Sequence, residues 1–168
     1  MVGAVSSDGR EPCRGSRGVT ERHRRTSRIL VLDQRDRTLL FLTRGSVPAQ
    51  PTRWITPGGG VEPGETHDEG ARRELFEETG LEIDDLGAPV WNLDFVVDYE
   101  GGDHDTGHAE YYVTRTSTFQ PSSSRWTPEE HSDVLEHRWW SLDELIATAE
   151  PCEPADLVTL IRSQLPSG

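Results

Sequence analysis

The sequence has no lysine, two cysteines and one methionine, and it has no long apolar run. Its basic side chains are therefore all arginine, which we interpret as a compositional bias rather than a functional feature. Cys13 and Cys152 lie far apart, and neither stands in a Cys-x-x-Cys motif, which argues against zinc binding through them and against a disulfide scaffold. No run approaches the roughly 18 apolar residues that a membrane-spanning helix needs.

The chain is strongly acidic, with 30 acidic side chains against 17 basic ones and a formal charge of −13. Non-specific binding to a nucleic acid duplex or an anionic membrane needs a basic surface, so the composition argues against both partners. A polyanionic ligand would meet a repulsive field and would need a divalent cation to accompany it.

The length of 168 residues predicts one domain with a real core. Residues 1–27 carry few large apolar side chains, so we expect a disordered leader there and a single folded domain over 28–168. The basic run at 22–28 is interpreted as a solvated tail, with phosphate binding as the alternative. Charges occupy the place where a signal peptide needs an apolar stretch, so we expect a cytoplasmic protein.

Apolar patterning and turn residues predict the order of the elements. Strands are expected at 28–33, 38–44, 54–56, 89–99, 108–119 and 137–140. Helices are expected at 66–79, 141–149 and 154–164, with an irregular helical turn in 128–136. Residues 57–60 are expected to form a glycine-rich turn. Hairpins with one helix between them and others at the end imply an α/β sandwich rather than a series of βαβ units.

The helix at 66–79 has the clearest boundaries. Thr66 and Glu69 form a capping box at its start, and Gly80 supplies the left-handed residue at its end. Ala71, Leu75 and Thr79 are expected to face inward. Ser141 and Glu144 form a second capping box, at the start of the helix over 141–149.

Glutamates crowd the stretch from Gly59 to Leu81. Glu74, Glu77 and Glu78 share one helical face, where they would raise one another's pKa if no cation lay among them. Hard oxygen ligands at this density suit Mg²⁺ or Mn²⁺. The alternative for any two of these residues is a solvated acidic face.

The same stretch resembles the Nudix box, GX5EX7REUXEEXGU with U aliphatic. It matches at Gly59, Glu65, Arg73, Glu74, Leu75, Glu77, Glu78, Gly80 and Leu81. The runs 54–60 and 138–142 also look like Nudix domains. The resemblance implies the family's fold, an α/β/α sandwich with a mixed β-sheet between helices.

The resemblance also implies an activity, the metal-dependent hydrolysis of the pyrophosphate link in a nucleoside diphosphate joined to another moiety. By analogy, Glu77 and Glu78 hold Mg²⁺ or Mn²⁺, and Glu74 joins them or acts as base. Arg73 orients the glutamates, Glu65 is an outer ligand or support, and Gly59 offers its carbonyl to the metal. In other members the base comes from a later loop. The candidates here are Glu110, Glu129, Glu130 and Glu136, with Glu130 preferred.

The sequence does not name the substrate. Four tryptophans are candidates for stacking a base, namely Trp91, Trp126, Trp139 and Trp140. A catalytically silent nucleotide sensor on the same fold is the alternative function, disfavoured because the box is complete. An isomerase of the same superfamily ranks last. Nudix enzymes are often dimers, so a homodimer is compatible with the resemblance, although no feature of the sequence indicates one.

Overall fold

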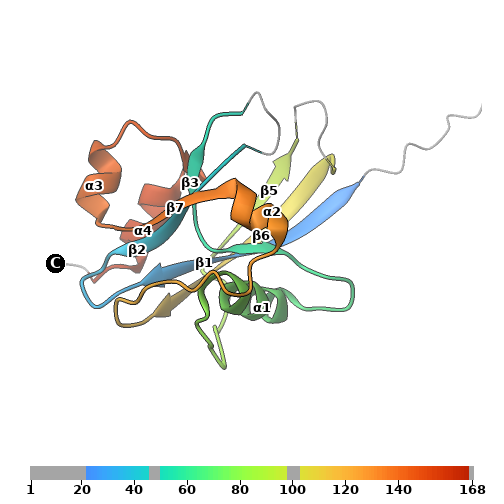
Figure 1. The fold of residues 1–168 in the computed structure, drawn as a ribbon, viewed down its shortest axis with the longest axis horizontal. Coiled ribbons are helices and arrows are strands. Elements are labelled where there is room, and N and C mark those ends of the chain that lie inside the picture. Colours follow the sequence, from blue (N-terminus) through green and yellow to red (C-terminus); the bar gives the residue numbers. More distant parts are fainter. Residues whose placement is uncertain (1–21, 46–49, 98–102, 167–168) are drawn as a thin grey trace, which may run out of the picture.

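The computed structural model describes residues 22–45, 50–97 and 103–166. Its elements, drawn in Figure 1, occur in the following order. They are β1 (His23–Leu32), β2 (Thr38–Thr43), β3 (Arg53–Ile55), β4 (Gly58–Gly60), α1 (His67–Thr79), β5 (Trp91–Val96), β6 (Thr106–Arg115), α2 (Pro128–Asp133), β7 (Val134–Trp140), α3 (Leu142–Ala147), β8 (Cys152–Glu153) and α4 (Leu157–Gln164).

One mixed, curled sheet organises the molecule, with the strand order β5-β6-β1-β2-β3-β8. The central strand β1 runs parallel to β6 along its whole length, and it pairs with β4 near its start and with β2 at its end. The strand β7 joins the sheet beside β2. Short hairpins therefore alternate with long connections, and the predicted α/β sandwich is confirmed.

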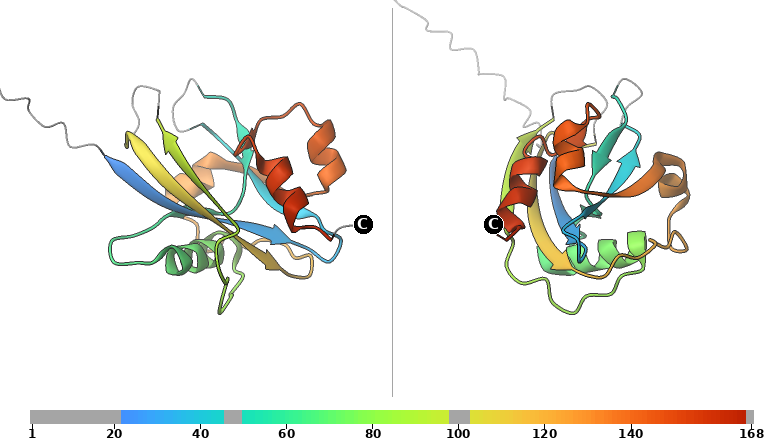
Figure 2. Two further views of the ribbon diagram at one scale, coloured as in Figure 1. Left: turned by 180° about the vertical axis from the view of Figure 1, so that it is seen from behind. Right: turned by 90° about the vertical axis from the view of Figure 1, so that its left-hand side faces the viewer.

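Helices cover both faces of the sheet (Figure 2). On one face, Ala71 and Leu75 of α1 pack against Ile29 and Val31 of β1. On the other face, α3 and α4 pack against the sheet through a cluster that includes Leu145, Leu157 and Ile161. Two cores on opposite sides of one sheet give the predicted order of layers, helix, sheet, helix.

The predicted start of the fold was wrong. The first strand begins at His23, so the basic run at 22–28 is part of the sheet rather than a solvated tail. Residues 23–32 pair with 106–115 of β6, and Thr26 and Ser27 are buried. The start of β1 is stabilised by pairing on two sides. Its local sequence has few apolar side chains and therefore does not predict a strand. Residues 1–21 of the predicted leader lie outside the described residues.

Two short strands were missed as well. The glycine run at 58–60, expected as a turn, is the strand β4 and pairs with residues 26–28 of β1. The two-residue strand β8 pairs with β3. Neither strand can be recognised from its own residues, because each forms only by pairing with a strand that is distant in the sequence. The short helix α2 and the strand β7 split the predicted irregular turn at 128–136.

Candidate functional site

Helix α1 has the predicted boundaries and orientation. The Thr66 side chain accepts from the Glu69 N–H and the Glu69 carboxylate accepts from the Thr66 N–H, which completes the capping box. The helix ends at Gly80, whose φ of 77° lies in the left-handed region. Ala71, Leu75 and Thr79 are buried as expected. This inward stripe fixes the rotation of the helix and so fixes which glutamates turn toward β4.

Three carboxylates meet beside β4. Glu74 and Glu78 come from α1 and Glu130 comes from α2, and each offers a ligand oxygen within 4.8 Å of the others. Glu130 is oriented by its own capping box, in which the Thr127 N–H donates to its Oε2 at 2.6 Å. Of the residues proposed from the sequence, the structure therefore brings Glu74, Glu78 and the preferred base candidate Glu130 together.

The strand β4 approaches these carboxylates very closely. The Gly58 N–H donates to Glu78 Oε2 at 2.7 Å, from a backbone with a φ of 124° that favours glycine. A Cβ on Gly59 would lie 2.7 Å from the carboxylate carbon of Glu74. Glycine at position 59 thus leaves the room in which the Glu74 carboxylate lies.

The cluster has unusual electrostatics for carboxylates. Burial raises the pKa of Glu78 to about 8, and the nearby Glu74 and Glu130 add to the rise, while the Gly58 N–H and Arg28 oppose it. Burial also raises the pKa of Glu74, against the opposing effect of Arg73. Carboxylates that are costly to ionise alone become favourable ligands once a cation lies among them. The donor set therefore fits Mg²⁺ or Mn²⁺.

Arg73 contacts Glu65 and Glu77, the two motif glutamates outside this cluster, together with Glu74. Its guanidinium donates to Glu65 at 2.8 and 3.0 Å, to Glu74 at 2.9 Å, to Glu77 at 3.1 Å and to the Gly60 carbonyl at 2.8 Å. The hydrogen bonds from Arg73 lower the pKa of Glu65 to about 2. Glu65 and Glu77 thus face Arg73 and are not members of the three-carboxylate cluster.

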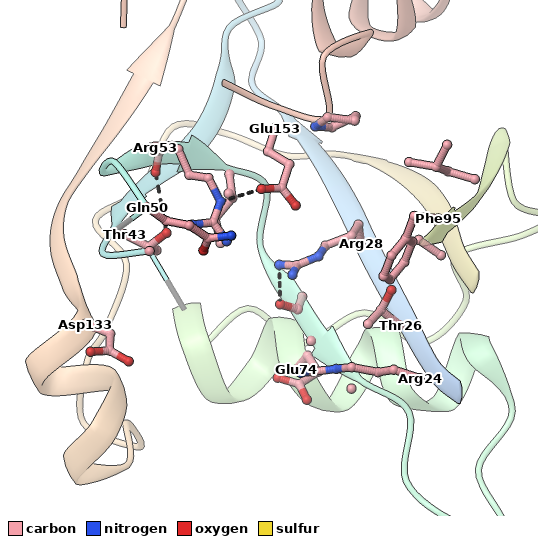
Figure 3. A pocket seen from close by; sticks show the side chains of 18 of the residues that line it. Arg24, Thr26, Arg28, Thr43, Gln50, Arg53, Glu74, Phe95, Asp133 and Glu153 are labelled. Atoms are coloured by element: carbon pink, nitrogen blue, oxygen red, sulfur yellow. Dashed lines mark hydrogen bonds and ion pairs between the residues drawn. The ribbon is translucent and has the colours of Figure 1, made fainter. Parts of the chain in front are cut away.

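A cavity of about 610 Å³ opens above the cluster, and Glu74 and Glu78 form part of its lining. Four arginines line the cavity as well, namely Arg24, Arg28, Arg44 and Arg53. Figure 3 labels Arg24, Arg28 and Arg53. Arg28 donates to the carbonyls of Thr56 and Gly58 at 3.2 and 2.7 Å, and Arg53 pairs with Glu153. Carboxylates and guanidinium groups therefore share one cavity.

The glutamates proposed as the catalytic base differ in whether they lie at the cavity. Glu129 lines the cavity beside Glu130. Glu110 is not among the lining residues and accepts from the Tyr112 hydroxyl at 2.6 Å. Glu136 lies exposed on β7, also away from the lining. Of the four candidates, Glu129 and Glu130 are the two that lie at the cavity.

The tryptophans serve packing in the described part of the chain, and none of the four candidates lines the cavity. Trp140 lies in the core beside Trp54, and Trp91 packs against Tyr111. The Trp126 indole N–H donates to the Glu78 carbonyl, and the Trp139 N–H donates to the Phe119 carbonyl. The aromatic side chains that do line the cavity are Phe95 and Tyr111.

The arginine lining was missed by the interpretation of the sequence. Arg24, Thr26 and Arg28 stand at alternate positions of β1 and all line the cavity. Alternate positions share one face of a strand, but the residues between them are polar too, so the sequence alone carries no alternation that marks this face.

Comparisons with known proteins match the chain to the NUDIX domain model over residues 22–160. An oxidized purine nucleoside triphosphate hydrolase from Mus musculus is 31% identical over 123 residues, which cover 70% of this chain and 65% of the mouse protein. An m7GpppN-mRNA hydrolase from Bos taurus is 42% identical over 55 residues, 32% of this chain and 18% of the bovine protein. The chain thus spans less than two thirds of either relative.

Solved structures share the fold of this chain. The crystal structure of a MutT protein from Methanosarcina mazei Go1 superposes with a TM-score of 0.64 at 19% identity, over 86% of this chain and 94% of that one. In the part of the chain that the structure describes, no helix has the length and apolarity needed to cross a membrane. The match to the family model extends from β1 into α4 and includes the carboxylates and the cavity, and the chain therefore belongs to the Nudix family of hydrolases.

Proposed function

We propose that this Nudix hydrolase uses a divalent cation to cleave the pyrophosphate link of a nucleoside diphosphate joined to another moiety. The observation that carries the proposal is the meeting of Glu74, Glu78 and Glu130 at a cavity that is also lined by arginines. A carboxylate cluster suits the cation, and arginines suit the phosphate oxygens that the cation leaves free.

Each carboxylate has a proposed role. Glu74 and Glu78 would hold Mg²⁺ or Mn²⁺, together with the Gly59 carbonyl that the resemblance implies. When bound, the cation supplies charge neutralisation at the phosphate oxygens and lowers the pKa of water. Glu130 accepts the proton of the attacking water, and its capping bond to Thr127 keeps its carboxylate in place.

Glu65 and Glu77 are proposed to act through Arg73. By contacting both of them together with Glu74, the guanidinium fixes the orientation of the Glu74 carboxylate at the edge of the cluster. Supporting contacts of this kind tune how well the ligand residues bind. This contact supports the support role of Glu65, and the metal-ligand role of Glu77 stays a prediction beside its contact with Arg73.

The cavity lining supports a nucleotide as substrate. Two carbonyls fix Arg28 Nη1, which leaves its other donors for a polyphosphate. The rings of Phe95 and Tyr111 supply an apolar section of the same cavity. A volume of about 610 Å³ suits a ligand of this size. The mouse relative is a hydrolase of oxidized purine nucleoside triphosphates and the bovine one of m7GpppN-mRNA, which supports the nucleotide class and leaves the attached moiety open.

A nucleotide panel with Mg²⁺ tests the proposal. The panel holds nucleoside triphosphates, oxidised purine triphosphates, dinucleoside polyphosphates, nucleotide sugars and capped dinucleotides, with products separated by anion-exchange chromatography. We expect at least one member to be cleaved at a pyrophosphate link and the cleavage to stop when a chelator is added. Tight binding without turnover across the panel would instead favour the silent sensor.

We also propose that the protein works in the cytoplasm. A homodimer is a separate proposal that rests on the resemblance alone. Light scattering coupled to size-exclusion chromatography tests it, because a dimer has twice the 18.8 kDa mass of the chain.

A further inference from the structure

A second group of potential ligands lies on the opposite face of β6 from the cavity. Successive side chains of a strand point to opposite faces, and Ala109 and Tyr111 line the cavity. His108 and Glu110 therefore face α1, where His67 stands at the start of the helix. The three side chains offer one ligand atom each, and these atoms all lie within 4.8 Å of one another.

The imidazoles are held by neighbouring groups in a way that fixes their orientation. His108 Nδ1 lies 2.6 Å from Asp94 Oδ1, so its Nε2 is the nitrogen that faces Glu110, at 3.9 Å from Oε1. His67 Nδ1 lies 3.0 Å from Ser27 Oγ and 3.1 Å from the Thr26 carbonyl. Histidines that bind metal commonly use one nitrogen for the metal and the other for such an outer partner.

The carboxylate is held in the same manner. The Tyr112 hydroxyl donates to Glu110 Oε2 at 2.6 Å, which leaves Oε1 on the side of His108. The outer partners come from β1, β5 and β6, and they hold all three potential ligands without using the atoms that converge. The face of the sheet under the start of α1 thus carries two nitrogen donors and one oxygen donor already oriented.

We propose that His67, His108 and Glu110 form a second metal site that binds Zn²⁺ or a similar first-row transition-metal ion. Two imidazoles and one carboxylate are ligands that zinc takes, with a fourth position left for water. The cluster at the cavity offers oxygen alone and suits Mg²⁺ or Mn²⁺. The two sites therefore differ in donor chemistry and lie on opposite faces of β6. This proposal does not rest on the proposed substrate.

One contact has to change when the metal binds. Arg25 Nε donates to His67 Nε2 at 3.3 Å, and Arg25 Nη1 donates to the Glu65 carbonyl. Arg25 is an exposed residue, so its side chain can turn into solvent when these two hydrogen bonds break. In the absence of metal, Arg25 occupies the nitrogen that the metal needs. Removing this side chain should therefore tighten metal binding.

Cobalt(II) is a suitable probe because its visible absorption is strong in a four-coordinate site with nitrogen ligands and weak in an octahedral oxygen site. The full chain is titrated with Co²⁺ in the presence of excess Mg²⁺, which competes for the carboxylates at the cavity. We expect one Co²⁺ with strong visible absorption per chain, its displacement by Zn²⁺, and a higher melting temperature with Zn²⁺.

Variants test which residues bind the Co²⁺ ion that absorbs. His108→Gln and Glu110→Gln are expected to weaken binding by about tenfold or more, since each removes a ligand. His23→Gln is the matched control, because it removes an exposed histidine of the sheet that is not part of the group. Arg25→Gln should strengthen binding. Circular dichroism of each variant checks its folding, with His67 left unchanged because its ring contacts the buried Ser27.

Three outcomes would overturn the proposal. The first is a wild-type chain that shows no strong visible absorption with Co²⁺. The second is an absorption that is unchanged in both folded variants, His108→Gln and Glu110→Gln. The third is loss of the absorption in Glu78→Gln, which would assign the ion to the cavity.

Discussion

At the scale of single residues, Arg73 separates the glutamates of the motif into two groups. Its planar fork reaches Glu65, Glu74, Glu77 and the Gly60 carbonyl together. A lysine carries one ammonium group and reproduces only part of this set. We expect Arg73→Lys to lower kcat/KM by about tenfold to a hundredfold, because the Glu74 carboxylate loses its support. Steady-state kinetics on the panel substrate measure the change.

The matched control for Arg73→Lys is the same substitution at the neighbouring residue, Arg72. Arg72 forms an ion pair with Asp68 at 2.8 Å and does not line the cavity. Arg72→Lys makes the same chemical change, so it should leave kcat/KM within about twofold, as expected for a partly exposed pair. Equal losses in the two variants would refute the role given to Arg73.

The close approach of Gly59 to the Glu74 carboxylate leads to a separate prediction. The added methyl group of Gly59→Ala would lie 2.7 Å from the Glu74 carboxylate, which is the end of a flexible side chain and can move aside. Stability should therefore change by less than about 1 kcal/mol. The displaced carboxylate should raise the Mg²⁺ concentration for half-maximal activity by about tenfold or more. Urea unfolding and Mg²⁺ titrations of activity measure the two effects.

Gly60→Ala serves as the comparison for Gly59→Ala. A Cβ at Gly60 would lie no closer than 3.7 Å to its nearest neighbour, Arg24, which is ordinary contact. It should shift the Mg²⁺ requirement much less than Gly59→Ala. A larger shift at position 60 than at 59 would contradict the account of close approach.

The sequence singles out the residues of the motif, but it does not predict the contacts that each of them makes. The pattern picks out Glu74, Glu77 and Glu78 alike, because spacing along one helix reports only a shared face. The contacts that distinguish Glu78 from Glu77 come from Gly58, Glu130 and Arg73. Only Arg73 lies on the same helix, so the rest depends on tertiary structure.

At the scale of elements, the turn between β1 and β2 depends on one buried carboxylate. Asp33 accepts from the Arg35 and Arg37 N–H groups, from the Arg37 guanidinium and from the Thr118 hydroxyl. Burial alone would raise the pKa of Asp33, but these hydrogen bonds outweigh it and lower the pKa to about 2. The folded state therefore binds the proton more weakly than the unfolded state does.

This shift predicts a pH dependence of stability. A lowered pKa stabilises the fold above the unfolded value of about 3.9, and the contribution disappears as the pH falls toward about 2. Asp33→Asn should therefore cost about 2 kcal/mol of unfolding free energy at pH 7, from a shift of nearly two pKa units. The difference from wild type should shrink between about pH 4 and pH 2. Urea unfolding at several pH values measures it.

Asp36→Asn, in the same turn, is the control. Asp36 pairs with Arg115 at 2.7 Å, and both side chains are more than 40% exposed. An exposed pair contributes about 0–1 kcal/mol, so the cost should be small. If Asp33→Asn costs no more than Asp36→Asn at pH 7, the account of the turn fails.

Elements with local signals were predicted well. The helix α1 has its cap, its inward stripe and its glycine stop within the same run of sequence, and all three are confirmed. The start of β1 and the whole of β4 have no such signals, because polar and glycine residues form strands there only by pairing with each other and, for β1, with β6. The cavity lies beside these unpredicted parts.

At the scale of the whole molecule, charge is distributed unevenly. The chain carries a formal charge of −13, yet four arginines line the cavity that also holds the carboxylates. The net charge predicts that a polyanion needs a divalent cation in order to bind. It does not predict the arginines at the cavity, because they come from β1, from β3 and from the residue after β2, which only the curled sheet brings together.

The central claim is that the carboxylates at the cavity hold the cation on which turnover depends, and Glu78→Gln tests it most directly. Turnover of the panel nucleotide is measured over a range of Mg²⁺ concentrations for wild type, for Glu78→Gln and for Glu82→Gln. Glu82 is an exposed carboxylate away from the cavity lining. We predict that Glu78→Gln lowers turnover by about a hundredfold or more while Glu82→Gln matches wild type. Equal turnover in all three proteins would contradict the claim.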